Sequence, residues 1–114
     1  MNTQTMTTKA EQIRQLNDML RTTLKGGKVV MTASVQSLHP DTVALALTKM
    51  RTFNDFTPDN NPYLENDFGS FELAGEKFFW KIDAYDRNME FGSEDPSDPD
   101  KTTRVLTLML AADY

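Results

Sequence analysis

The sequence of 114 residues lacks cysteine and contains a single histidine, His39. Without cysteine the chain has no disulfide bond, no thiolate nucleophile and no cysteine-ligated zinc or iron–sulfur site, which fits a reducing cytoplasm. A catalytic histidine requires a partner within hydrogen-bond distance. Because His39 stands directly before Pro40, where a helix is expected to begin, we interpret it as a helix-start residue.

Long apolar runs and phosphate-binding loops are missing as well. No segment approaches the roughly 20 apolar residues of a membrane span, and the polar N-terminus lacks the apolar region of a secretory signal. The five glycines form neither a phosphate-binding loop nor the Gly-x-Ser-x-Gly turn of serine hydrolases. We therefore expect no cofactor and no membrane partner, and we favour binding over catalysis.

Basic residues are scarce in the second half of the chain. Residues 1–53 carry seven Lys/Arg and three Asp/Glu, a net charge of +4, whereas residues 54–114 carry five Lys/Arg and fourteen Asp/Glu, a net charge of −9. Direct nucleic-acid binding usually needs a basic surface, so we expect none. An acidic surface suits a basic protein or nucleoprotein partner; the alternative is that it only keeps a small cytoplasmic protein soluble.

The first half of the chain predicts two helices and one strand within a single domain that covers residues 1–114. After a disordered tail at residues 1–7, a capping-box pattern begins an amphipathic helix that two glycines end near residue 27. Alternating apolar residues predict a strand over 28–35. His39-Pro40-Asp41 then begins a second helix.

The second half predicts three strands. Residues 67–74 and 77–85 form a hairpin around a tight turn at Gly75-Glu76. Residues 87–101 form an acidic, proline-containing connection, for which a solvated loop is the main interpretation and a docking surface for a basic partner the second. Residues 103–111 suit a central strand, although a helix also fits their apolar spacing.

The order of these elements defines the expected fold class. It is an α+β two-layer sandwich, with two helices packed on one face of an antiparallel sheet of about four strands. The hairpin carries aromatic residues on both faces, so helices on one face would leave Phe71, Phe79 or Tyr85 on an open sheet. Such a patch is typical of a protein interface or a homodimer contact.

Several segments are distinctive together. The chain reads NPYLENDFG at 61–69, FFWKIDAYD at 78–86, and DPSDP followed by TTRVLTLMLAADY at its end. With LNDMLR and GGKVVMTASV near the start, they resemble an uncharacterised bacterial family, a domain of unknown function, over about residues 12–114. The resemblance implies a small protein that is often encoded on plasmids or other mobile elements and whose activity is not established.

The chain departs from this family at one place. The family commonly has a histidine after the glutamate of the ENDFG-like segment, whereas this chain has Asn66. Chemistry that relies on an imidazole there is therefore not expected in this protein.

Four carboxylates are the first candidate site: Glu65, Asp67, Asp83 and Asp86. Antiparallel pairing across the turn brings their ends of the hairpin together, with Asp67 roughly opposite Asp83 or Tyr85. Close carboxylates can hold Mg²⁺ or Ca²⁺, or divide into a general acid and a general base. The structural alternative is that Asp67 caps a strand and Asp83 pairs with a lysine or arginine, which is the commoner use of paired acids.

A binding interface is expected where acidic and aromatic residues converge at this end of the hairpin. Its members are Tyr63, Glu65, Asp67, Trp80, Asp83, Tyr85 and Asp86. The favoured hypothesis is a non-enzymatic acidic protein that docks on and modulates another macromolecule, in its sharpest form a mobile-element-encoded anti-CRISPR or anti-restriction inhibitor. One alternative is a small metal-dependent hydrolase or nuclease that uses the four carboxylates. Another is a regulatory accessory domain that acts as a homodimer.

Overall fold

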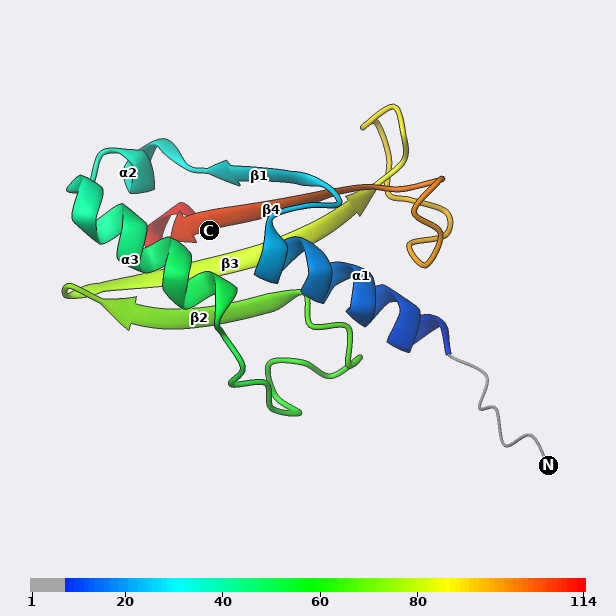
Figure 1. Ribbon diagram of the computed structural model, residues 1–114, viewed down its shortest axis with the longest axis horizontal. Coiled ribbons are helices and arrows are strands. Elements are labelled where there is room, and N and C mark those ends of the chain that lie inside the picture. Colours follow the sequence, from blue (N-terminus) through cyan, green and yellow to red (C-terminus); the bar gives the residue numbers. More distant parts are fainter. Residues whose placement is uncertain (1–7) are drawn as a thin grey trace.

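A computed structural model describes residues 8–114 of the chain; the tail expected at residues 1–7 lies outside them. Helices and strands alternate in the first half, and strands dominate the second (Figure 1). In chain order the elements are α1 (Lys9–Thr23), β1 (Lys28–Met31), α2 (Ala33–Gln36), α3 (Pro40–Arg51), β2 (Phe68–Leu73), β3 (Glu76–Tyr85), β4 (Thr103–Leu110) and the 3-10 helix η1 (Ala111–Asp113).

The four strands form one sheet in the order β1-β4-β3-β2. The β2–β3 and β3–β4 pairs are antiparallel, and β1 joins β4 in parallel. Figure 1 shows α1 and α3 on the same side of this sheet. The α+β fold class is therefore confirmed, with a mixed and mostly antiparallel sheet, and the last segment is a central strand as the sequence indicates.

The first strand is shorter than the expected range 28–35. It ends at Met31 because the Thr32 side chain accepts a hydrogen bond from the backbone N–H of Val35 and so caps the short helix α2. Val35 therefore belongs to this helix and not to a strand, and its side chain is fully buried. The same alternation of apolar residues thus serves a strand and then one helical turn.

The core lies between the helices and one face of the sheet. Alternate residues of β3, namely Phe78, Trp80 and Ile82, are buried, and the spacing of two that the sequence shows is the reason they share a face. Buried residues from β4 and the helices complete this core: Leu106 and Leu108, with Leu20, Ala46 and Met50. The stacked pair Phe71 and Phe78 belongs to this face as well.

Among residues 8–114, no long helix covers the opposite face of the sheet. Phe68 and Phe79 lie side by side there with ring centroids 5.3 Å apart, and the exposed ring of Tyr114 packs edge-on against both. Phe79 and Tyr85 alternate along β3 with the buried Phe78, Trp80 and Ile82, so these two lie on the open face. Phe71, the third aromatic residue expected there, pairs with Phe78 and lies on the helix side.

No helix within residues 8–114 combines the length and apolar character needed to cross a membrane.

Gly69 lies against the ring of Trp80, its partner across the β2–β3 ladder. A Cβ atom at this position would fall 2.5 Å from Trp80 Nε1, inside the contact distance of any real side chain. We expect Gly69→Ala to lower the free energy of unfolding by about 1–3 kcal/mol, the usual cost of overpacking a core. Gly92→Ala is the control, because its Cβ would meet only the Ala84 carbonyl oxygen, at 4.0 Å. Equal urea midpoints for the two variants would contradict this account of Gly69.

Candidate functional site

The connection between β3 and β4 projects from one end of the sheet, in the yellow to orange colours of Figure 1. We call residues 86–100 the acidic lobe. It contains six carboxylates and one cationic side chain, Arg87. The carboxylates are those of Asp86, Glu90, Glu94, Asp95, Asp98 and Asp100.

The first turn of the acidic lobe is held by Asp86. Its carboxylate accepts hydrogen bonds from the backbone N–H groups of Asn88 and Glu90, both at 3.1 Å, and its own N–H donates to the Phe91 carbonyl. This turn presents Phe91 to solvent with 71% of its surface exposed, and Met89 with 39%. Asp86 therefore orders the turn, and its carboxylate is already engaged.

The second half of the acidic lobe is ordered by hydroxyl groups. The Asp95 carboxylate accepts hydrogen bonds from the Ser97 hydroxyl at 2.5 Å and from the Ser97 backbone N–H at 3.2 Å. The bond from the hydroxyl is the main reason that the pKa of Asp95 lies below its ordinary value. The Thr102 hydroxyl donates to the Asp95 carbonyl and lies 2.7 Å from the Ser93 hydroxyl. Despite its two prolines, the lobe is thus a hydrogen-bonded structure.

Arg104 of β4 ties the acidic lobe to the core. Its side chain is buried, with 3% of the residue exposed, and this burial lowers the pKa of its guanidinium. Nη2 donates to the carbonyl of Pro96 in the lobe, and Nε donates to Asn17 Oδ1 of α1 at 2.8 Å. A buried guanidinium requires such partners because water cannot reach it.

Asn17 connects this guanidinium to the loop before β2. Its Nδ2 donates to the Glu65 carbonyl at 2.9 Å, so one amide joins Arg104 and the 61–67 segment. In the same loop Asn66 has a left-handed backbone, φ 54°, which asparagine tolerates better than most residues. The Asn66 amide donates to the Asp18 carboxylate at 3.0 Å. Asn66 is thus a structural residue here.

Arg21 makes a second buried connection one turn further along α1. Its Nη1 donates to the carbonyls of Met50 and Phe53, at 3.0 and 2.9 Å, which bonds α1 to the end of α3. Its guanidinium carbon lies 5.0 Å from the Trp80 ring centroid, within cation–π distance. Nη2 contacts the Asp18 carboxylate at 3.3 Å.

Sequence reasoning missed Asn17, Arg21 and Arg104, although a signal for each is present. Asn17 lies three residues before Leu20 and four residues before Arg21, so the three side chains share one buried stripe of α1. Arg104 alternates with Leu106 and Leu108 along β4, so it occupies an inward position of the strand. A polar residue at an inward position predicts a buried hydrogen-bond network.

The four sequence-predicted carboxylates have separate environments. Asp83 forms a 2.8 Å ion pair with Lys81, and Asp86 holds the turn described above. Ile82 donates its N–H to the Asp67 carbonyl, so Asp67 lies opposite Ile82 instead of Asp83 or Tyr85. Within residues 8–114 no group of three or more Asp, Glu or His side chains is arranged to hold a metal ion.

The charge of Asp67 nevertheless acts on Glu65. Partial burial is the main cause that raises the pKa of both carboxyls. The charge of Asp67 raises the pKa of Glu65 further, Arg104 opposes this, and the charge of Asp83 raises that of Asp67. These three acids are therefore electrostatic neighbours at the edge of the buried network.

The aromatic members of the predicted interface differ in their exposure to solvent. Tyr63 is 77% exposed in the loop before β2, and Tyr85 is partly exposed at the end of β3. Trp80 is fully buried beneath Phe53 and Phe56, so it has no surface to offer a partner. Its role is in the core.

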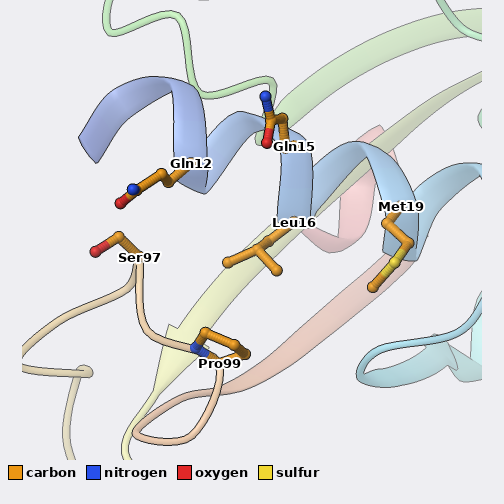
Figure 2. Close-up of a pocket in the computed structure, with 6 residues that line it drawn as sticks. All are labelled: Gln12, Gln15, Leu16, Met19, Ser97 and Pro99. Atoms are coloured by element: carbon orange, nitrogen blue, oxygen red, sulfur yellow. The ribbon is translucent and has the colours of Figure 1, made fainter. Parts of the chain in front are cut away.

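A groove separates α1 from the acidic lobe. Figure 2 shows Leu16 of α1 pointing toward Pro99, with Gln12 above Ser97 at one end of the groove and Met19 at the other. Lys9 and Asp95 form an exposed ion pair of 3.7 Å between the same two elements. The lobe thus approaches α1 along its length and is positioned by it.

The fold and this site define a small α+β domain with a buried arginine network and an acidic projection. The chain belongs to a family of proteins of unknown function, DUF3768, whose model matches residues 31–113. The match begins at Met31, so α1 lies outside it. No curated protein and no solved structure was found to match the chain.

The buried network depends on the side-chain amide of Asn17. Asn17→Ala leaves the Arg104 Nε and the Glu65 carbonyl without their partner, so we expect a loss of about 1–3 kcal/mol in the free energy of unfolding. Amide hydrogen exchange at residues 93–99 should become faster, because Arg104 also holds Pro96. Gln15→Ala, an exposed position on the same helix, is the control. Unchanged stability and exchange in the Asn17 variant would contradict the proposed role of the network.

The raised pKa values of Glu65 and Asp67 predict a pH dependence. Both carboxyls bind protons more tightly in the folded chain than in the unfolded chain, so their contribution favours folding in acid and is lost as pH rises through the raised values. We expect the double variant Glu65→Gln, Asp67→Asn to melt at a higher temperature than the native chain at neutral pH. The difference should vanish below about pH 3, where both carboxyls are largely protonated in either state. A double variant that is less stable at neutral pH would show that the charged forms are needed.

Proposed function

We propose that this protein is a non-enzymatic binding protein whose acidic lobe docks on a basic surface of another macromolecule. The observation that carries the proposal is the exposed Phe91 on a hydrogen-bonded turn among carboxylates. An aromatic side chain held in solvent by an ordered backbone is a feature that binding explains and folding does not.

An aromatic ring and a thioether are effective contacts for a partner. Binding energy in interfaces concentrates in a few buried side chains, aromatic ones above all. Phe91 and Met89 have the exposed area to supply it. Because Asp86 already fixes their turn, little conformational entropy remains to be lost on binding.

The charges around Phe91 indicate that the partner surface is positively charged. Glu90, Glu94 and Asp100 are exposed, and Glu94 makes a 3.7 Å contact with the exposed Lys101. Carboxylates on the rim of an interface accelerate the encounter with a basic surface. The chemistry of the lobe therefore fits a protein or nucleoprotein surface rich in lysine and arginine.

The sharper form of the proposal is an anti-defence inhibitor encoded on a mobile element, which acts on a CRISPR or restriction nuclease complex. DNA-binding surfaces of such complexes are basic, and the lobe would present carboxylates where phosphates bind. The acidic charge and the resemblance noted above support this form.

Charge-neutral variants of the acidic lobe test the docking proposal. We expect Glu90→Gln, Glu94→Gln, Asp100→Asn to weaken partner binding about tenfold or more at low salt, because steering by rim charges is removed. Asp86 and Asp95 are left intact since they hold the lobe together. The measurement is capture of bacterial lysate proteins on the immobilised chain, followed by surface plasmon resonance with each captured protein.

The matched control places the same change of charge elsewhere. Asp41→Asn, Asp59→Asn, Glu76→Gln neutralises three exposed acids outside the lobe and should bind like the native chain. The complex of the Phe91→Ala variant should have a shorter lifetime than the complex of the native chain. If lobe and control variants bind equally, or if no protein is captured at any salt concentration, the docking proposal fails.

A further inference from the structure

One edge of the sheet is open for pairing. Within residues 8–114, β2 pairs only with β3, and no backbone hydrogen bond joins its other side to another segment. Natural edge strands are usually protected by proline, lysine, a bulge or short length. The six residues of β2, FGSFEL, contain no proline and no lysine, and pair with β3 without interruption from Phe68 to Leu73.

The backbone groups that face this open edge follow from the ladder. Ile82 donates its N–H to the Asp67 carbonyl at 2.8 Å, so Asp67 directs its backbone toward β3. Because these directions alternate along an antiparallel strand, Phe68, Ser70 and Glu72 direct their N–H and C=O groups away from β3. Three residues thus offer free donors and acceptors to an added strand.

We propose that this edge binds a second copy of the chain, with β2 antiparallel to β2 about a two-fold axis at Phe71. In this register Phe71 meets Phe71 of the second copy, and Ser70 meets its Glu72. The first is an aromatic pair across the close, non-hydrogen-bonded position of the ladder. The second sets a hydroxyl opposite a carboxylate and occurs twice by symmetry, and no like charges face each other.

The surface beside the edge is complementary to itself. A groove at the edge of β2 is lined by Lys49, Thr52, Phe53, Asn54, Asp55, Ser70 and Phe71. It carries one cation, Lys49, and one anion, Asp55. A two-fold axis sets the groove of each copy against that of the other, where Lys49 of one copy complements Asp55 of its partner. This two-sign pattern favours a second copy over an unrelated peptide.

The dimer would give a continuous sheet of eight strands, twice the four of one chain. Antiparallel pairing directs the two copies in opposite senses, so the two acidic lobes would lie at opposite ends. If the lobes bind as proposed above, such a dimer engages two sites at once and gains avidity. The dimer itself is independent of that function and is tested without any partner.

Sedimentation equilibrium of the native chain and two variants at Ser70 provides the first test. The native chain should show a reversible monomer–dimer equilibrium, and Ser70→Pro should shift it to monomer. Proline removes a donor from the open edge and none from the β2–β3 ladder. Ser70→Thr keeps the N–H and should dimerise like the native chain. A native chain that stays monomeric up to its solubility limit, or a folded Ser70→Pro variant that still dimerises, overturns the proposal.

Cysteine crosslinking tests the register and does not depend on the proline variant folding. The chain has no cysteine, and Ser70 and Glu72 lie on the open face, so the double variant Ser70→Cys, Glu72→Cys should fold. In the proposed register each cysteine lies opposite one of the second copy, within disulfide distance, and mild oxidation should give a covalent dimer. Each single variant should give much less. Equal crosslinking in single and double variants, or none at all, overturns this register.

Discussion

A buried hydrogen bond from Arg104 to Asn17 is the contact on which the arrangement of the molecule depends. It joins β4 to α1, and through the other groups of the same two side chains it reaches the acidic lobe at Pro96 and the loop before β2 at Glu65. A guanidinium without partners in the core would cost several kcal/mol. The chain can therefore bury Arg104 only when all these segments are in place, which makes their positions mutually dependent.

The division of charge between interior and surface follows from the same contact. Arg104 is satisfied by an amide oxygen and a carbonyl oxygen, so its burial does not consume a carboxylate. Arg21 donates most of its hydrogen bonds to the carbonyls at the end of α3, where the helix dipole favours a cation. Two arginines are thus withdrawn into the fold while most acids stay outside, and the surface is more acidic than the net charge of −5 implies.

Periodicity predicted most of the fold, because apolar spacing decides which face of a helix or strand is buried. It predicted both main helices, the hairpin and the central strand, but not the parallel β1–β4 pair, since pairing partners are not encoded in local spacing. The hairpin turn lies at Ala74-Gly75, both with positive φ, and not at Gly75-Glu76. Because the turn sets the register of the whole ladder, Asp67 lies opposite Ile82 and not opposite Asp83 or Tyr85. The buried polar network was missed because an apolar pattern disregards the polar residues within it.

Fold and function use different carboxylates of the acidic lobe. Asp86 and Asp95 are engaged by backbone and hydroxyl donors, so they belong to the fold. Within residues 8–114 the side chains of Glu90 and Asp100 form no hydrogen bond or ion pair, and that of Glu94 contacts exposed Lys101 at 3.7 Å. Asp86 and Asp95 nevertheless fix the positions of these three acids by ordering the backbone of the lobe. The family match at 31–113 contains Arg104 and the whole lobe but not Asn17. The position of the lobe therefore depends on a helix outside the matched region, and a chain reduced to residues 31–113 would keep the acids while losing the partner that holds Arg104 beneath them.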